Sequence, residues 1–150
     1  MVKSDINAIC AAIEIETQGD FKICDGIRGD LTIQIPMKKF LPVIKLLVIK
    51  MDCRHLSGVT AQLHPEHPNK IEVLYHFWMG SGFSIMMLLP EESPKLPEIF
   101  SILPGADFYE REVAEMFGIQ FVGREDMPPL LLPDGWDQGP PFIKKEVIDE

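Results

Sequence analysis

Apolar residues recur at two different spacings along the chain, and the spacing distinguishes helices from strands. Within residues 4–16 they lie three and four positions apart, at Ile6, Ile9, Ala12 and Ile13. This spacing predicts one face of an α-helix, and Ser4 or Asp5 can cap its first turn. A second helix, with Pro42 in its first turn, is predicted by the same spacing at Ile44, Leu47, Val48 and Met51.

Strands are predicted where apolar and polar residues alternate, or where aromatic and aliphatic residues are concentrated. These stretches are residues 31–37, 55–65, 70–79 and 82–90. Before them, segment 21–30 has a glycine turn and is interpreted as a hairpin that supplies one further strand. The glycines of 80–82 join the last two strands as a hairpin. With a final helix, the order α-β-β-α-β-β-β-α predicts an α+β two-layer sandwich. We expect a mainly antiparallel sheet with helices on one face.

The composition changes from residue 90 onward, since nine of the thirteen prolines lie at or beyond Pro90. A helix is predicted at about 108–117, ended by Gly118. The rest is rich in proline and glycine and has no periodicity, so we expect it to run along another surface. The chain therefore divides into an α+β globular domain, residues 1–122, and an extended partner-binding arm, residues 123–150.

Charge and cysteine content exclude several classes of protein. The net charge is −9 and no cluster of basic residues is present, which disfavours nucleic-acid binding. The start of the chain lacks the apolar region of a signal peptide, and the apolar run 40–51 is too short to span a bilayer. Three scattered cysteines without a C-x-x-C pair indicate neither a disulfide framework nor an iron–sulfur cluster in this chain.

A cluster of charged residues at 110–115 is the first candidate for chemistry. On a helix Glu112 and Glu115 share a face, and such a pair can do acid–base work or bind a cation. The alternative is a solvated helix face on which Arg111 pairs with Glu115, four positions on. The residues by themselves leave both interpretations open.

Histidines are the second candidate. His64 and His67 could offer two imidazoles to a metal, but Pro65 disfavours a helical pair and no third ligand is near in sequence. We therefore interpret them as loop histidines and expect no metal site. His76 is interpreted as a hydrogen-bonded strand histidine. No nucleophile motif and no phosphate-binding glycine loop is present, so no catalytic residue is assigned.

The run from Ala106 to Trp136, "ADFYEREVAEMFGIQFVGREDMPPLLLPDGW", resembles the 30 kDa subunit of respiratory complex I, the proton-pumping NADH:quinone oxidoreductase. The residues shared with the family motif are Glu110, Arg111, Glu112, Val113, Met116, Phe117, Gly118, Ile119, Phe121, Gly123, Asp126, Leu131, Leu132, Pro133 and Trp136. Phe108 replaces a tryptophan of the motif, and Pro128 and Pro129 replace two arginines. These departures favour a relative such as the equivalent subunit of an energy-converting NiFe hydrogenase.

The resemblance implies a subunit of an oxidoreductase complex without activity of its own and without a cofactor. Its expected partners are a large hydrogenase-like subunit and a small Fe–S subunit, which would hold the NiFe or quinone site and the clusters. It would lie in the cytoplasm at the inner face of the membrane, through the complex, and could dimerise when isolated. The expected partner-binding residues are Glu110, Arg111, Glu112, Phe117, Phe121, Asp126, Pro128, Pro129, Pro133 and Trp136. The alternatives are a stand-alone enzyme using Glu112 and Glu115, or a free binding module.

Overall fold

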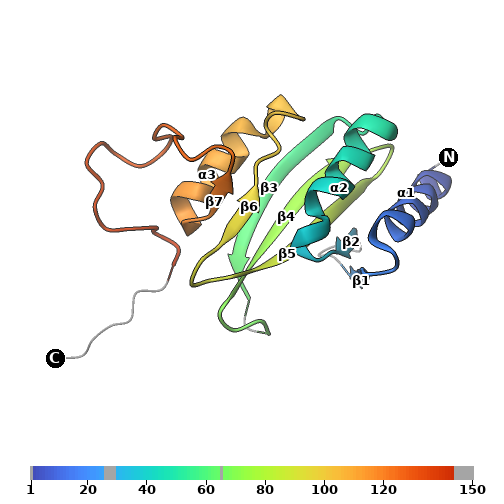
Figure 1. Ribbon diagram of the computed structural model, residues 1–150, viewed down its shortest axis with the longest axis horizontal. Coiled ribbons are helices and arrows are strands. Elements are labelled where there is room, and N and C mark those ends of the chain that lie inside the picture. Colours follow the sequence, from blue (N-terminus) through green and yellow to red (C-terminus); the bar gives the residue numbers. More distant parts are fainter. Residues whose placement is uncertain (1, 26–29, 65, 144–150) are drawn as a thin grey trace.

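The computed structural model describes residues 2–25, 30–64 and 66–143. A five-stranded sheet of order β1-β2-β5-β4-β3 is its centre (Figure 1). The strands are β1 Lys22–Asp25, β2 Leu31–Gln34, β3 His55–Leu63, β4 Lys70–Trp78 and β5 Gly82–Pro90. All neighbouring pairs are antiparallel except β2 with β5, because the chain crosses the sheet between those two strands.

One face of the sheet carries the core. Every second residue of β4 is buried and pairs with a buried residue of β5; the pairs are Ile71 with Leu89, Val73 with Met87, Tyr75 with Ile85 and Phe77 with Phe83. Each such side chain contributes about 1.5–3 kcal/mol when it leaves water. The intervening residues, Glu72 and His76 among them, point to the opposite face.

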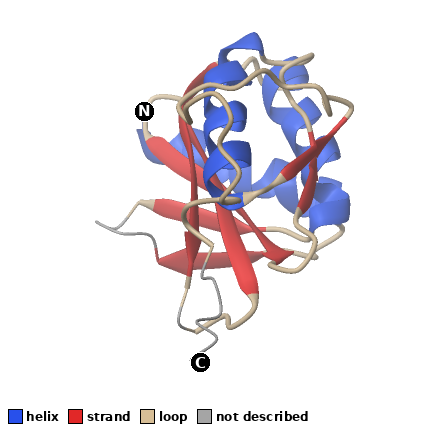
Figure 2. Cartoon of the chain, turned by 90° about the vertical axis from the view of Figure 1, so that its left-hand side faces the viewer, coloured by secondary structure: helices blue, strands red, loops and turns tan. Residues whose placement is uncertain are grey.

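The helices cover the core face. They are α1 Val2–Thr17, α2 Phe40–Lys45 with the π turn η3 Leu46–Lys50 as its continuation, and α3 Asp107–Phe117. Buried side chains from all three join the same cluster as the sheet, and Figure 2 shows α2 and α3 on one side of the strands. Pro42 is tolerated in α2 because the first turn of a helix has no partner for its backbone N–H groups.

A second, two-stranded sheet was not predicted. β6 Lys95–Pro97 pairs in parallel with β7 Gln120–Val122, and a short 3-10 helix, η4 Pro104–Ala106, precedes α3. Leu96 and Phe121 of this pair are buried in the main core. The pair therefore fastens both ends of the α3 region to the domain.

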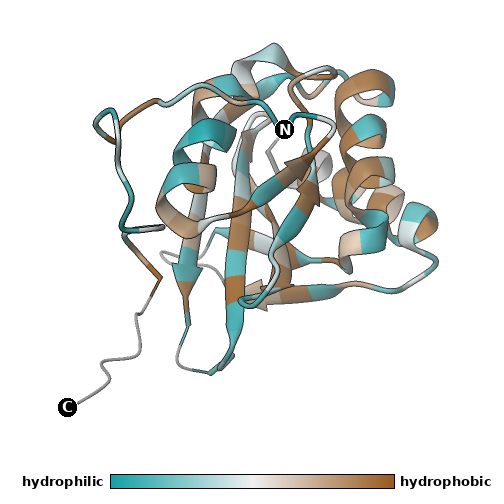
Figure 3. Cartoon of the chain, turned by 60° about the vertical axis from the view of Figure 1, so that its left-hand side comes forward, coloured by the Kyte–Doolittle hydropathy of each residue, from teal (hydrophilic) through white to brown (hydrophobic). Residues whose placement is uncertain are grey.

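The predicted α+β architecture is confirmed, and the predicted helices and strands occur in the predicted order, with β6 and β7 in addition. The arm from residue 123 contains no helix or strand within its described part, 123–143. Figure 3, coloured by hydropathy, shows it outside the domain at the left, with hydrophilic and hydrophobic stretches in turn. Residues 144–150 of the predicted arm lie outside the described residues.

Candidate functional site: the two sides of helix α3

Helix α3 lies between the domain and the arm, and its two sides make different polar contacts. One side presents Glu110 and Val113 to the core, and both are buried. Another side presents Arg111 and Glu115 to the backbone of arm residues 128–132. The charged residues of this helix therefore have two roles: Glu110 lies in the domain interior, whereas Arg111 and Glu115 bind the arm.

Glu110 is fully buried, which is rare for a carboxylate. Its Oε1 accepts the backbone N–H of Ile99 at 2.8 Å and the Tyr75 hydroxyl at 3.4 Å. Burial, assisted by the charge of Glu98, raises the pKa of Glu110 to about 7. The two hydrogen bonds and the nearby Arg124 guanidinium limit that rise. Glu110 thus joins strand β4, the segment after β6 and helix α3, and it titrates near neutral pH.

Arg124 fixes the point where the arm leaves the domain. Its Nη2 donates to Oδ1 of Asp107, and its guanidinium lies 4.3 Å from the centre of the Phe100 ring. Its Nη1 is buried without a hydrogen bond and lies 4.0 Å from Oε2 of Glu110, which also lacks one. The cation therefore compensates the buried carboxylate by charge, beyond hydrogen-bond distance.

On the outer side, Glu115 binds the arm through the backbone. Its two carboxylate oxygens accept the N–H groups of three consecutive residues, Leu130 at 2.5 Å, Leu131 at 2.7 Å and Leu132 at 3.3 Å. Partial burial opposes ionisation, but these hydrogen bonds and Arg111 hold the pKa of Glu115 below its usual value. A carboxylate that accepts several backbone N–H bonds is a strong, charge-assisted anchor.

Arg111 also holds the arm, but as a hydrogen-bond donor where Glu115 is an acceptor. Its Nη2 donates to the carbonyl oxygens of Pro128 at 3.4 Å and Pro129 at 3.1 Å, and its Nη1 lies 3.7 Å from Asp107. The predicted ion pair between Arg111 and Glu115 is absent from the salt bridges of the described residues. Each of the two side chains holds the arm backbone instead, and a groove between α3 and the arm is lined by both.

The C-terminal end of α3 is shaped for the arm as well. Gly118 ends the helix with a left-handed φ of 70°, which glycine adopts without strain. A Cβ at this position would lie 2.8 Å from Cγ of Pro140. The N–H of Phe142 donates to the carbonyl of Met116 at 3.0 Å, and the Phe142 and Phe117 rings meet edge to face. The arm thus returns to the helix end after leaving the helix beyond Leu132.

The expected partner-binding residues fall into two groups in this structure. Glu110 and Phe121 are buried, and Arg111 and Phe117 contact the arm. The members that are exposed are Glu112, Asp126, Pro128, Pro129, Pro133 and Trp136. Trp136 is 38% exposed and its indole N–H donates to the Gly139 carbonyl at 2.7 Å. The first group lies in the domain interior or holds the arm, and the second group, on α3 and on the arm, is exposed.

The structure also brings in residues that sequence reasoning missed. Tyr75, Ile99 and Arg124 surround Glu110, and the amides of 130–132 surround Glu115. One signal for the inward role of Glu110 was present, because Ala106, Glu110, Val113 and Phe117 form a helical stripe that is otherwise apolar. Against an acid–base pair, Glu112 is exposed and the oxygens of Glu115 are occupied by the arm.

The chain matches a known protein family over most of its length. Residues 33–150 match the family described as "Respiratory-chain NADH dehydrogenase, 30 Kd subunit". The chain belongs to this family. It is 32% identical over 116 residues to the corresponding NADH-quinone oxidoreductase subunit of Rhodopseudomonas palustris, covering 75% of this chain and 58% of that protein. It is 30% identical over 141 residues to the same subunit of Rhodobacter capsulatus, covering 91% and 70%.

Two solved structures share this fold. The trypsin-resistant fragment (1–134) of Nqo5 superimposes with a TM-score of 0.67 at 26% identity, covering 85% of this chain and all of that fragment. A chain of the membrane-bound sulfane sulfur reductase, described as an archaeal respiratory membrane complex, gives a TM-score of 0.68 at 24% identity and shares the fold. It covers 87% of this chain and 79% of that one. This member of the 30 kDa family spans less than two thirds of the Rhodopseudomonas relative.

Proposed function

We propose that this 30 kDa family member is a non-catalytic subunit in the peripheral arm of a complex I-like NADH:quinone oxidoreductase or of an energy-converting NiFe hydrogenase. It binds the large hydrogenase-like subunit and the small Fe–S subunit, and those partners hold the quinone or NiFe site and the clusters. Family membership and the respiratory complexes named for its relatives support this proposal. No helix of the described residues is long and apolar enough to cross a membrane, so we assign contact with the membrane to the complex.

The observation that carries the proposal is the way the arm is held. Its backbone is bound by Glu115 and Arg111, while several of its large apolar side chains face outward. Leu131 is 59% exposed, Phe142 58% and Trp136 38%. A monomer gains nothing from fixing apolar side chains in water, whereas a docking segment gains affinity because less freedom is lost on binding.

In this proposal the arm binds the large subunit. Trp136 is the anchor in this proposal, since tryptophan is enriched among the residues that dominate binding energy and its position is already fixed by Gly139. Pro128, Pro129 and Pro133 limit the backbone freedom of the arm, which bends at 130–132 and turns between Pro133 and Trp136. Glu112 and Asp126 are exposed acids that can form the polar rim.

Isolation from the native host tests the proposal. A chain with a small affinity tag, expressed at its normal level, is expected to bring down a hydrogenase-like large subunit and an Fe–S subunit that mass spectrometry identifies. Recovery of the chain alone or only as a homodimer, from detergent-solubilised membranes and from the soluble fraction, would contradict it.

Matched variants locate the interface. Trp136→Ala and Leu131→Ser are expected to reduce recovery of the large subunit at least tenfold, while the thermal unfolding temperature stays within a few degrees of wild type. Ile15→Ser is the control, because Ile15 is 79% exposed on α1, and α1 lies at the opposite end of the molecule from the arm (Figure 1). Equal losses in the control and the arm variants would place the interface elsewhere.

A further inference from the structure

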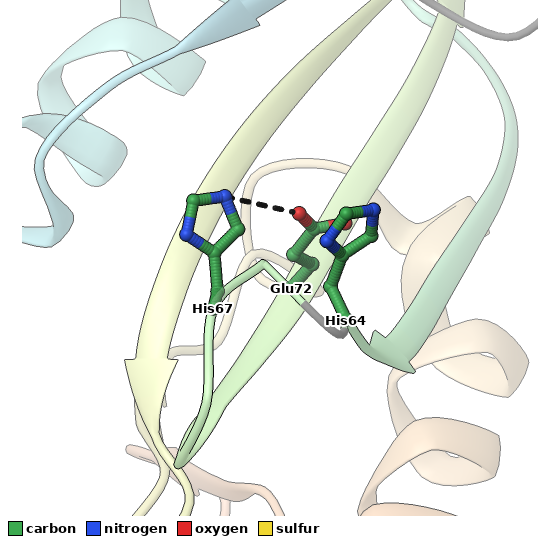
Figure 4. A group of neighbouring side chains, drawn as sticks. All are labelled: His64, His67 and Glu72. Atoms are coloured by element: carbon green, nitrogen blue, oxygen red, sulfur yellow. Dashed lines mark ion pairs between the residues drawn. The ribbon is translucent and has the colours of Figure 1, made fainter.

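The β3–β4 hairpin brings three metal-ligating side chains together. His64 and His67 lie in the loop and Glu72 in β4, and one ligand atom from each lies within 4.8 Å of the other two. Figure 4 shows the imidazoles on either side of the carboxylate. His67 Nε2 and Glu72 Oε1 are 3.7 Å apart. The cluster lies on the sheet face opposite the helices, so it is separate from the α3 site.

Strand pairing and the loop turn explain why these residues meet. Leu63 pairs with Ile71, so the loop begins next to Glu72. The N–H of His67 donates to the carbonyl of His64 at 3.0 Å, which closes a turn and places the two rings 5.5 Å apart. Residues three apart in such a turn are near neighbours in space. The two imidazoles are thus positioned by the backbone of the turn.

Glu72 is the feature that points to a cation. It is only 5% exposed, yet it is an ionisable side chain on the sheet face that the helices do not cover. Gln62 Nε2 donates to its Oε2 at 2.5 Å, which leaves most of its acceptor capacity unused. Among the described residues, His67 is the one basic side chain within 4.0 Å of it. Buried carboxylates are normally compensated by a cation or several donors.

We propose that His64, His67 and Glu72 form a binding site for a divalent transition metal of the zinc class. Two imidazole nitrogens and one carboxylate oxygen are a ligand set that proteins use for Zn²⁺, with a fourth position left for water. Gln62 acts behind the site by orienting the carboxylate, as neighbours of metal ligands commonly do.

The rearrangement needed to bind is small. Ligand atoms around tetrahedral Zn²⁺ lie about 3.4 Å apart, so the side chains must close by about 1 Å. The two histidines are partly exposed and free to make that movement. The N–H of Glu66 donates to Nδ1 of His64 at 3.2 Å, an exposed contact that must change if Nδ1 itself binds the metal or takes up a proton. The bound ion would tie the loop to β4 and stabilise the hairpin at the edge of the sheet.

Metal titration of the whole chain tests the site. The protein is purified without a histidine tag, freed of metal, and titrated with ZnCl₂ by calorimetry, with Co²⁺ absorption to report a four-coordinate nitrogen and oxygen site. We expect about one ion per chain. The double variant His64→Ala, Glu72→Gln is expected to weaken binding at least tenfold, and Gln62→Leu by a smaller factor.

The control and the folding check keep the result interpretable. His55→Ala removes an exposed histidine of β3 outside the cluster and should leave Zn²⁺ affinity unchanged. Far-UV circular dichroism must show that each variant is folded. Zn²⁺ affinity that is the same in wild type and the double variant overturns the proposal. So does one ion per two chains, or an equal loss of affinity in His55→Ala.

Discussion

The domain and the arm are held by opposite kinds of interaction. The domain is stabilised by apolar side chains that are buried between the helices and one face of the sheet. The arm is held chiefly by its backbone, which is bound by Glu115 and Arg111, while Leu131 and Trp136 stay exposed. Packing of the first kind makes a fold cooperative, whereas local hydrogen bonds can open without unfolding the rest. One helix, α3, takes part in both.

The difference predicts that matched aromatic substitutions have very different costs. Phe40 is fully buried in α2 with its ring 4.9 Å from that of Tyr75, and Phe40→Ala should lower the free energy of unfolding by about 3–5 kcal/mol. Phe142 touches Phe117 but is 58% exposed, and Phe142→Ala should cost less than about 1 kcal/mol. Urea unfolding of the two variants measures both values. Similar costs would show that the arm is part of the cooperative core.

Glu110 is the place where the domain interior should respond to pH. Its pKa in the folded chain is about 7, raised from 4.5, so the folded state binds this proton more tightly than the unfolded state. The contribution of Glu110 to stability is therefore complete below about pH 4.5 and is lost as the pH rises through about 7. The loss is on the order of 3 kcal/mol.

Glu110→Gln removes this titration and keeps an oxygen that can accept the Ile99 N–H. We expect the stability of the variant relative to wild type to increase between pH 5 and 8, as followed by urea unfolding at each pH. Glu112→Gln is the control, because Glu112 lies on the same helix and is exposed. Parallel pH curves for Glu110→Gln and wild type would contradict the inference.

The elements that could be predicted from sequence are those with a local signal. Helices α1 and α3 and strands β4 and β5 are long enough for their periodicity to be read, and Gly118 marks a helix end by its conformational freedom alone. The β6–β7 pair could not be found, because three residues show no period and its partners lie 25 positions apart, as in Lys95 with Gln120.

The site was harder to predict because its chemistry depends on pairing across the fold. Sequence placed Glu110, Arg111 and Glu115 on one helix, but the prediction did not use the otherwise apolar stripe that turns Glu110 toward the core. For the histidine loop the third ligand was sought near His64 and His67 along the chain. Glu72 comes instead from the strand across the hairpin, and the pairing of Gln62 with Glu72 would have indicated it.

The smallest predicted effect separates the arm from the domain most sharply. Glu115→Gln weakens the acceptor of three arm amides, so hydrogen exchange at 130–132 should accelerate on the order of tenfold, with global stability changed by less than about 1 kcal/mol. Because the pKa of Glu115 is lowered in the folded chain, its contribution is present above the usual carboxyl range and is lost as the pH falls through its folded value. Wild type at low pH should therefore approach the variant, after correction for intrinsic exchange rates. If exchange at 130–132 is instead as slow as in the core strands and rises only with global unfolding, the arm is held by packing and not by this carboxylate.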